Sequence, residues 1–310
     1  MTYKIGVDGG GTKTECILVD ASGAVVARHL APGCNPSIVG PEQARLIVTD
    51  ALCALVAAVA SSETRGAQGA KPIIVSTHLY MAGSRAFWAE TAAGWRDFGR
   101  CTVADDSLPV LELATHGQPG LVLHAGTGSF VAARGPDGAV HYAGGTGWRF
   151  GDPGSGYDIG RRAVGRALLE LQGWAPLSRL GPTVRAQTQL GEAADAGAVT
   201  RFFYQHPEAN RQIAALAPAI LRLASEGDPT AQQLVADSCA ELLALAVQVA
   251  TKLFVGTPLD TLPVGLSGPI LNHPVVISAL APRSPLALVP VEGAPIEGVR
   301  RLVMRDSGKL

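Results

Sequence analysis

Two glycine-rich turns of similar composition lie 115 residues apart in the sequence, with Gly11 aligned to Gly126 and Thr12 aligned to Thr127. Each turn joins two apolar runs that read as strands. Glycine lets the backbone turn sharply and approach a ligand, and successive free N–H groups form a concave anion-binding site. Because the hydroxyls of Thr12, Thr127 and Ser129 add donors, the two turns predict polyphosphate binding rather than two ordinary tight hairpins.

A charged residue lies on each side of the first turn. Asp8 ends the preceding strand, and Lys13 adds a positive charge beside the turn. A carboxylate at this place cannot contact phosphate favourably unless a cation lies between them. Mg²⁺ prefers oxygen ligands and keeps several waters, so Asp8 is a candidate ligand for hydrated Mg²⁺.

Asp105 and Asp106 are adjacent carboxylates that follow a short apolar strand and precede a helix. Phosphoryl transfer to a hydroxyl needs positioning, charge neutralisation and an acceptor for the hydroxyl proton. A carboxylate can be that acceptor, but aspartate also commonly caps helices. We expect one of the pair to be a cap and the other a general base; their residue types do not say which.

A glycine-dense loop over residues 144–156 contains Asp152. Such a loop suits close approach of the backbone to a sugar whose hydroxyls hydrogen-bond to Asp152, although a structural turn explains it equally well. Trp148 could stack on a sugar ring, but a buried packing role is favoured. Asn35, between proline and glycine residues, indicates turn chemistry, and His124 receives no role.

Composition indicates a compact globular protein of two domains. The chain has 310 residues, 47% of them hydrophobic and 16% charged, and its net charge is −1. No basic field is present to attract nucleic acid or an anionic membrane. We expect no signal peptide and no apolar run long enough to span a bilayer. The five scattered cysteines indicate buried thiols in a reducing cytoplasm rather than disulfides or a zinc site.

The pattern of apolar residues predicts two α/β halves, each opening with a three-strand meander. The predicted elements are meanders over 3–30 and 120–143, helices over 41–60, 85–98 and about 229–255, a helical stretch over 158–255, and a last helix starting near Pro295. Ligands of α/β sheets lie at the carboxyl ends of the strands. Since the candidate residues fall at such ends, we expect them to converge on one cleft.

Six motifs, in order, resemble the sugar-kinase/Hsp70/actin superfamily, and more narrowly the BadF/BadG/BcrA/BcrD family with its N-acetylglucosamine kinase members. The resemblance runs from residue 5 to about residue 300. The matching segments are Gly6–Thr14, Gly33–Pro36, Val103–Ser107, Gly126–Ser129, Gly151–Tyr157 and Gly265–Pro269.

The resemblance implies an α/β fold of two RNase-H-like (actin-like ATPase) lobes around a central cleft, the second lobe enlarged by helices. The first lobe is expected over 1–115 and the second, with its helical insertion, over 116–310. The last helix, about 295–305, could pack back on the first lobe. The implied cofactors are ATP and Mg²⁺, with Gly268 near adenosine. The implied ATP-binding residues are Asp8, Gly9, Gly10, Gly11, Thr12, Lys13, Thr14, Gly126, Thr127, Gly128, Ser129 and Gly268.

The resemblance also implies roles for the carboxylates. Asp106 aligns with the family's catalytic base and leaves Asp105 at a variable position; Asp8 and Asp106 are the implied Mg²⁺ ligands. The implied sugar-binding residues are Asn35, Asp106, Gly145 and Asp152. The chain departs from the family pattern at Thr146, Pro153 and Ser267, and the first two departures lie in the sugar loop, so they bear on substrate identity.

These inferences favour a cytoplasmic kinase that transfers the γ-phosphate of ATP to the 6-hydroxyl of an amino sugar, N-acetylglucosamine first and glucosamine second. One alternative is an ATPase of the same family that activates a radical dehydratase through an iron–sulfur cluster; the absence of cysteine just before Gly126 disfavours it. Another is a sugar-sensing regulator, for which no basic helix-turn-helix is seen. The expected partners are the sugar and ATP, without nucleic acid or membrane; the stretch 158–255 offers surface for a homodimer.

Overall fold

The computed structural model describes residues 1–63 and 72–305. The chain divides into two compact units. Unit 1 comprises Met1–His116 and the segment from residue 292 onward, and unit 2 comprises Gly117–Val291. The last segment therefore belongs to the unit that contains the N-terminus.

Unit 1 is built on a five-stranded sheet with the order β3-β2-β1-β4-β5. The first three strands form the antiparallel meander, and β4 and β5 run parallel to β1. The parallel strand β4 follows a long crossover through a helix, as a parallel connection requires. The strands are β1 (Thr2–Gly9), β2 (Lys13–Asp20), β3 (Val25–Pro32), β4 (Ile73–Met81) and β5 (Arg100–Asp105).

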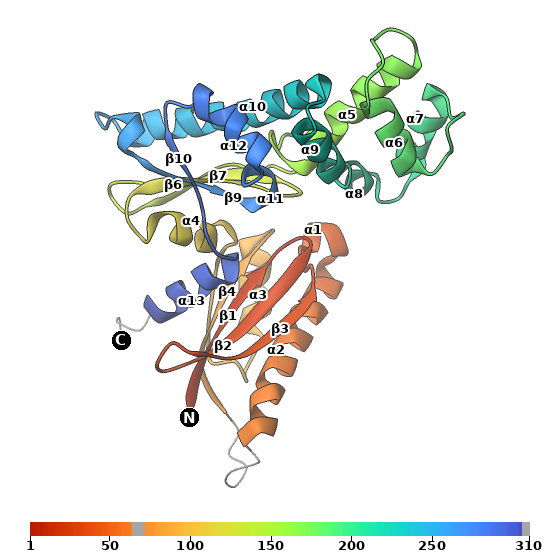
Figure 1. Cartoon of the computed structure of the whole chain (residues 1–310). Coiled ribbons are helices and arrows are strands. Elements are labelled where there is room, and N and C mark those ends of the chain that lie inside the picture. The colour runs from red at the N-terminus through yellow and green to blue at the C-terminus, as the bar shows by residue number, and fades with distance from the viewer. Residues whose placement is uncertain (64–71, 306–310) are drawn as a thin grey trace. The chain divides into compact units, whose positions relative to one another are not determined.

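Alternation of side chains along these strands gives unit 1 two hydrophobic cores, one on each face of its sheet. Ile5 and Leu18 pack with Leu52 of α2 on one face, while Ile17 packs with Val299 of α13 on the other. Figure 1 shows α2 and α13 on opposite sides of the sheet. The helices of unit 1 are α1 (Pro36–Val39), α2 (Pro41–Glu63), α3 (Arg85–Ala93), α4 (Ser107–Thr115) and α13 (Pro295–Arg305).

The helix α13 is tied to α4 by a very close backbone approach and an ion pair. A Cβ atom at Gly298 would overlap the carbonyl oxygen of Pro109, so only glycine fits at this position. The guanidinium of Arg305 lies 2.7 Å from a carboxylate oxygen of Glu112, which is fully buried. The end of the chain thus supports the helix that follows Asp106.

Unit 2 repeats the same sheet topology, with the order β10-β9-β6-β7-β8. Its antiparallel meander corresponds to that of unit 1, and β9 and β10 are the two parallel strands. Two sheets of this shared order define two RNase-H-like lobes, as expected. The strands are β6 (Gly120–Ala125), β7 (Ser129–Arg134), β8 (Val140–Gly144), β9 (Pro263–Ser267) and β10 (Ala287–Pro290).

The remaining helices enlarge unit 2 and share one large hydrophobic core with its sheet. They are α5 (Gly156–Leu171), α6 (Leu180–Thr188), α7 (Ala196–Gln205), α8 (Ala209–Ala214), α9 (Ala217–Ser225), α10 (Pro229–Leu253), α11 (Gly268–Leu271) and α12 (Pro274–Leu280), with short 3₁₀ turns at Leu259–Thr261 and Ala281–Arg283.

The expectation that no apolar run is long enough to span a bilayer was wrong for α10. This helix is long and apolar enough to cross a membrane by length and composition, with a mean hydropathy of 1.5 over its most apolar window. Its stripe of Val235, Cys239 and Leu242 nevertheless packs into the core of unit 2, and α10 lies across the sheet in Figure 1. A helix buried in this way is apolar because the core requires it.

Another element differs from expectation in length. The helix expected over 85–98 ends at Ala93. Gly94 caps that helix with its N–H bonded to the carbonyls of Ala92 and Thr91. All five cysteines are free thiols as expected, but Cys53 is exposed and Cys101 is half-buried rather than buried.

The contact at Gly298 gives a stability prediction. Gly298→Ala should lower the free energy of unfolding by about 1–3 kcal/mol, because the new methyl group must displace α13 from α4. Gly165→Ala is the matched control: this helical glycine has open space around its Cβ position, and alanine there should be neutral or stabilising by up to about 1 kcal/mol. Thermal unfolding followed by circular dichroism measures both; equal melting temperatures would contradict the packing described.

Candidate active site

The first glycine turn joins β1 to β2 and is covered by the loop that carries Asn35. The N–H of Gly33 donates to the carbonyl of Thr12 at 3.1 Å, and that of Cys34 donates to the carbonyl of Gly10 at 3.0 Å. A side chain at Gly33 would overlap the backbone of Gly11. The loop therefore rests directly on the turn, which fixes Asn35 beside it.

The second glycine turn joins β6 to β7 and is held by the start of α5. The N–H of Gly156 donates to the carbonyl of Gly126 at 2.7 Å, and that of Tyr157 donates to the carbonyl of Thr127 at 3.3 Å. Asp152 lies close to the turn, since a Cβ atom on Gly128 would be 2.9 Å from its carboxylate. The glycine loop and the turn therefore form one continuous piece of structure.

The internal repeat continues into the hydrogen bonds of the two turns. The Thr14 hydroxyl donates to the carbonyl of Pro32 at 2.8 Å, and the Ser129 hydroxyl, 115 residues later, donates to the carbonyl of Pro153 at 2.7 Å. Both side chains are buried. The Thr14 hydroxyl thus bonds to the end of β3, just before the loop that carries Asn35, and the Ser129 hydroxyl bonds to the glycine loop. The equivalent pair Thr12 and Thr127 is exposed and free to meet a ligand.

Asp8 and Asp106 lie near each other in unit 1 and are both hard to ionise. Burial, followed by the charge of Asp106, raises the pKa of Asp8 to about 7. Burial, followed by the charge of Asp105, raises the pKa of Asp106 to about 6. Lys13 offsets the effect on Asp8 only in part, because its ammonium is paired with Glu15 at 3.1 Å. Two neighbouring carboxylates are therefore left with little neutralising charge.

This donor set fits a divalent cation that brings other ligands with it. Among residues 1–63 and 72–305, no cluster of three or more His, Cys, Asp or Glu side chains could hold a metal ion. Mg²⁺ is typically held by one or two carboxylates, waters and substrate phosphates, so Asp8 and Asp106 are sufficient protein ligands for it.

Asp106 occupies the N-cap position of α4, but its side chain makes no capping hydrogen bond. Asp106 therefore does not make the capping contact that was expected of one of the two aspartates. Its carboxylate is left available for chemistry, and Asp105 ends β5.

Asn35 does the turn chemistry that its residue type indicated. Its side-chain oxygen accepts a hydrogen bond from the N–H of Ser37 at 3.0 Å and caps the short helix α1. The amide nitrogen of Asn35 is the part of this side chain that a ligand could use as a donor.

The glycine loop of unit 2 holds Asp152 in a demanding conformation. Asp152 has a φ of 80°, which is rare for a residue with a side chain, and its carboxylate accepts from the N–H of Gly147 at 3.2 Å. The N–H of Gly145 donates to the carbonyl of Ser129 at 3.1 Å, and Tyr142 fills the space where a Cβ on Gly145 would lie. Strain of this kind is common at functional sites.

Gly268 and Ser267 lie next to the second turn. Gly268 has a φ of 89°, and a Cβ there would overlap the backbone of Ala125. The Ser267 hydroxyl lies 3.2 Å from Nδ1 of His124, whose ring stacks on Phe130. Burial lowers the pKa of His124 to about 4, so its imidazole is neutral. His124, to which the sequence assigned no role, thus connects the second turn to the Gly268 motif.

The structure therefore groups the sequence-predicted residues by unit. Unit 1 brings together the Gly9–Thr14 turn, Asp8, Asn35 and Asp106, and unit 2 brings together the Gly126–Ser129 turn, Gly145, Asp152 and Gly268. The expectation that Trp148 is buried was wrong, since 43% of this residue is exposed.

Comparison with known proteins identifies the class. The model of the BadF/BadG/BcrA/BcrD ATPase family matches residues 5–283. The chain belongs to the BadF/BadG/BcrA/BcrD ATPase family.

Three proteins illustrate the similarity. An N-acetyl-D-glucosamine kinase of Dictyostelium discoideum is 27% identical over 259 residues, covering 80% of this chain and 79% of the relative. An N-acetylmuramic acid/N-acetylglucosamine kinase of Clostridium acetobutylicum is 22% identical over 247 residues, covering 78% and 77%. A solved structure from Chromobacterium violaceum, provisionally named N-acetylglucosamine kinase, is 28% identical with a TM-score of 0.77, covering 97% of this chain and 98% of that one.

The paired hydroxyls give a second prediction. Thr14→Val and Ser129→Ala should each lower stability by about 1–3 kcal/mol, because each leaves a proline carbonyl without its buried partner. Thr251→Val is the control, since its hydroxyl makes the same type of bond, to the carbonyl of Val247, on an exposed helix surface. Denaturant unfolding measures the changes; losses no larger than that of the control would show that the loops are held by other contacts.

The carboxylate pair gives a pH prediction. The pKa values of Asp8 and Asp106 are raised in the folded protein, so protonation of these two carboxyls stabilises the fold. Their contribution to the free energy of unfolding is complete below about pH 4 and is lost as the pH rises through 6 and 7. In metal-free buffer, Asp106→Asn should therefore raise the melting temperature more at pH 8 than at pH 5. A gain of a few degrees is expected, since about 1 kcal/mol corresponds to about 2–4 °C.

The exposed Asp50 supplies the control for this experiment. Asp50→Asn should change the melting temperature by the same small amount at both pH values, because its side chain is exposed. A gain for Asp106→Asn that did not grow with pH would contradict the assignment of a buried, repelling pair.

Proposed function

We propose that this protein is an ATP-dependent kinase that transfers the γ-phosphate to the 6-hydroxyl of an amino sugar, with N-acetylglucosamine as the first candidate and glucosamine as the second. The observation that carries the proposal is Asp106, a half-buried carboxyl at the start of α4 with no capping bond and with its pKa raised to about 6. A carboxyl titrating near neutral pH suits a general base.

The choice of sugar is supported by the relatives. Three similar proteins carry N-acetylglucosamine kinase names, and each alignment extends over most of this chain. The membership in an ATPase family supports ATP as the phosphate donor.

In the proposed mechanism the two turns bind the nucleotide phosphates. Backbone N–H groups of Gly9–Thr14 and Gly126–Ser129, with the exposed hydroxyls of Thr12 and Thr127, donate to phosphate oxygens. Gly268 allows the backbone to come close to adenosine. Mg²⁺ held through Asp8 and Asp106 would neutralise charge on the phosphates.

The sugar is positioned by the loops that rest on the turns. The amide nitrogen of Asn35, the backbone of Gly145 and the carboxylate of Asp152 hydrogen-bond to its hydroxyls. Asp106 accepts the proton of the 6-hydroxyl as the new phosphorus–oxygen bond forms. Within each unit, the Thr14 and Ser129 hydroxyls hold the segment that carries a proposed sugar-binding side chain beside the adjacent glycine turn.

The ATPase alternative needs a cluster ligand that the second turn does not offer. His124 and Ala125 precede Gly126, where a cluster-ligating cysteine would be needed, and Cys101 belongs to unit 1. The neutral, stacked His124 supports packing behind a phosphate turn instead.

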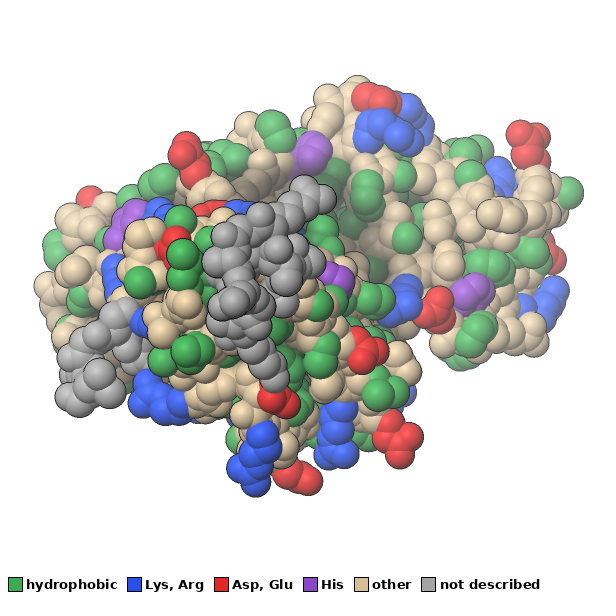
Figure 2. Space-filling model, turned by 90° about the horizontal axis from the view of Figure 1, so that it is seen from below, with side chains coloured by type: hydrophobic (Ala, Val, Ile, Leu, Met, Phe, Trp, Pro, Cys, Tyr) green, Lys and Arg blue, Asp and Glu red, His purple; other side chains and the backbone are tan. Residues whose placement is uncertain are grey.

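The proposal includes a cytoplasmic location and no nucleic-acid or membrane partner. On the face drawn in Figure 2, Lys and Arg side chains are interspersed with Asp and Glu side chains among the described residues. The net charge of −1 likewise provides no strong field for a polyanion. Helices of unit 2 offer surface for a homodimer, which sedimentation would test.

ADP release with MgATP and a panel of sugars tests the function. We expect turnover with N-acetylglucosamine, less with glucosamine, and little with N-acetylmannosamine, glucose or no sugar. Asp106→Asn should lower turnover by about a thousandfold, because the proton acceptor is lost. Asp105→Asn is the matched control and should lose far less. Sugar-independent ADP release, or equal loss in the two variants, would reject the kinase or its base.

A further inference from the structure

Lys13 is the only cationic residue of the two candidate phosphate turns, Gly9–Thr14 and Gly126–Ser129. It begins β2, and the aligned position of the second turn is occupied by Gly128. The Lys13 ammonium lies 3.1 Å from a carboxylate oxygen of Glu15, although 55% of the lysine side chain is exposed. A side chain that solvent and ligands can reach is therefore held at its charged end by a protein partner.

Glu15 is a buried carboxylate on the same face of the sheet as Asp8. These two residues are directly opposite each other in the register of β1 and β2, and opposed residues of antiparallel strands share a face. Lys13 lies two residues before Glu15 in the same strand, so it shares this face as well. Only 8% of Glu15 is exposed. The pair of Lys13 and Glu15 thus stands beside the carboxylate proposed to hold Mg²⁺.

Glu15 is also held from its other side, by arginine. Nη1 of Arg28 lies 3.5 Å from the second carboxylate oxygen of Glu15, and Nη2 of Arg28 bonds to Glu297 of α13 at 2.8 Å. Glu297 in turn accepts from Arg300 at 3.2 Å, one helical turn further along α13. A buried carboxylate is costly without partners. Arg28 therefore offsets the charge of Glu15 and fixes its position independently of Lys13.

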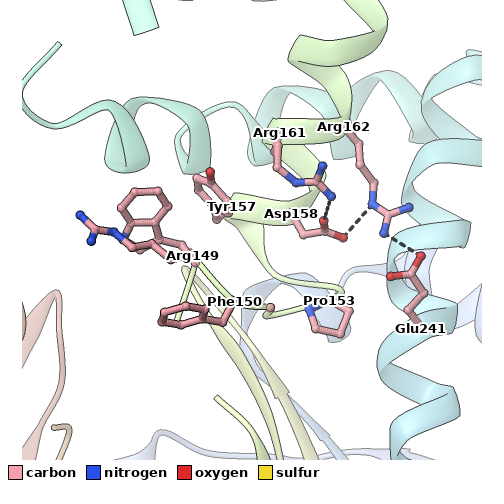
Figure 3. A pocket seen from close by; sticks show the side chains of 10 residues that line it. Arg149, Phe150, Pro153, Tyr157, Asp158, Arg161, Arg162 and Glu241 are labelled. Atoms are coloured by element: carbon pink, nitrogen blue, oxygen red, sulfur yellow. Dashed lines mark hydrogen bonds and ion pairs between the residues drawn. The ribbon is translucent and has the colours of Figure 1, made fainter. Parts of the chain in front are cut away.

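The buried carboxylate of Asp158 in unit 2 has a different set of partners. Asp158 accepts from Arg161 and from Arg162, each at 2.8 Å, and Arg162 also reaches Glu241 of α10 at 2.7 Å (Figure 3). Both arginines belong to α5, as Asp158 does, and neither lies in a glycine turn. That network ties α5 to α10. At Glu15, by contrast, one of the two partners is the lysine of a candidate phosphate turn.

The Lys13 ammonium can serve a ligand without leaving Glu15. An ammonium has three donor hydrogens, so one can stay on the carboxylate while another reaches a phosphate oxygen. A free lysine side chain samples many rotamers, and ordering it on binding costs free energy. Because Glu15 already restricts Lys13, less of this cost remains when a phosphate binds. The charge of Glu15 would by itself repel a phosphate, but Arg28 offsets it.

We infer that Glu15 is a positioning residue for the nucleotide: it holds the Lys13 ammonium beside the first glycine turn, ready to bind a phosphate of ATP, and Arg28 holds Glu15. The inference rests on the function proposed above. Glu15 acts through Lys13 and does not contact the nucleotide. Its contribution should therefore disappear when the lysine is removed, which a residue that only supports the fold would not show.

A double-mutant cycle tests the inference. Isothermal titration calorimetry measures binding of the β,γ-imido analogue of ATP, with Mg²⁺, to the wild type, Glu15→Gln, Lys13→Met and the double variant. Glu15→Gln should weaken binding by about fivefold, or about 1 kcal/mol, the scale of ordering one long side chain. Lys13→Met should weaken it by about tenfold or more, because a charged hydrogen bond is lost. In the Lys13→Met background, Glu15→Gln should have no further effect.

Glu297→Gln is the matched control, because it removes a partner of Arg28 but leaves the contact between Lys13 and Glu15 in place. It should leave the dissociation constant close to that of the wild type. Equal weakening by Glu15→Gln and Glu297→Gln would overturn the inference, since Glu15 would then act through α13. An effect of Glu15→Gln that persists without Lys13 would overturn it as well.

The proposed function fails in a different way. A wild type that binds the analogue but phosphorylates no sugar of the panel would reject the proposed kinase, while the cycle would still decide the role of Glu15. A wild type that does not bind the analogue would reject both the function and the inference.

Discussion

The candidate site in each unit depends on a hydrogen bond from a buried hydroxyl at the start of a strand to a proline carbonyl, which ends β3 in unit 1 and lies in the glycine loop in unit 2. Thr14 makes it to Pro32 and Ser129 makes it to Pro153, at 2.8 and 2.7 Å. A buried hydroxyl needs a partner, so these bonds hold the end of β3 and the glycine loop beside the two glycine turns. Asn35 follows the end of β3 and Asp152 lies in the glycine loop, so each candidate phosphate turn positions a side chain proposed to bind the sugar.

The second constraint is the burial of carboxylates with too little neutralising charge. In unit 1, burial raises the pKa of Asp8 and of Asp106; the charge of Asp106 adds to the effect on Asp8, and the charge of Asp105 adds to the effect on Asp106. Such an arrangement is unfavourable for stability. It suits a site where a divalent cation binds and a carboxylate accepts the proton of a hydroxyl group. The contrast with Asp158 in unit 2 is informative, since paired arginines keep that carboxylate ionised and structural.

Much of the fold could be predicted because the spacing of apolar residues and the residue types of turns act locally in the sequence. Both meanders and α10 follow from apolar spacing, and the start of α13 follows from Pro295. The family and the residues of the two glycine turns could be predicted because six motifs occur in a fixed order along the chain. The bonds of Thr14 and Ser129 could not be predicted, because a hydroxyl near a glycine turn could equally face the ligand or the protein. The exposure of Trp148 depends on tertiary packing, which one-dimensional patterns do not contain.

The most direct test of the central claim is the position of the transferred phosphate. A correlation between ³¹P and ¹H in the product formed from MgATP and N-acetylglucosamine would identify the carbon that bears it. We expect coupling of the phosphorus to the two protons on carbon 6. Phosphorus coupled to the proton on carbon 1, or only ADP and inorganic phosphate in the presence of the sugar, would contradict it.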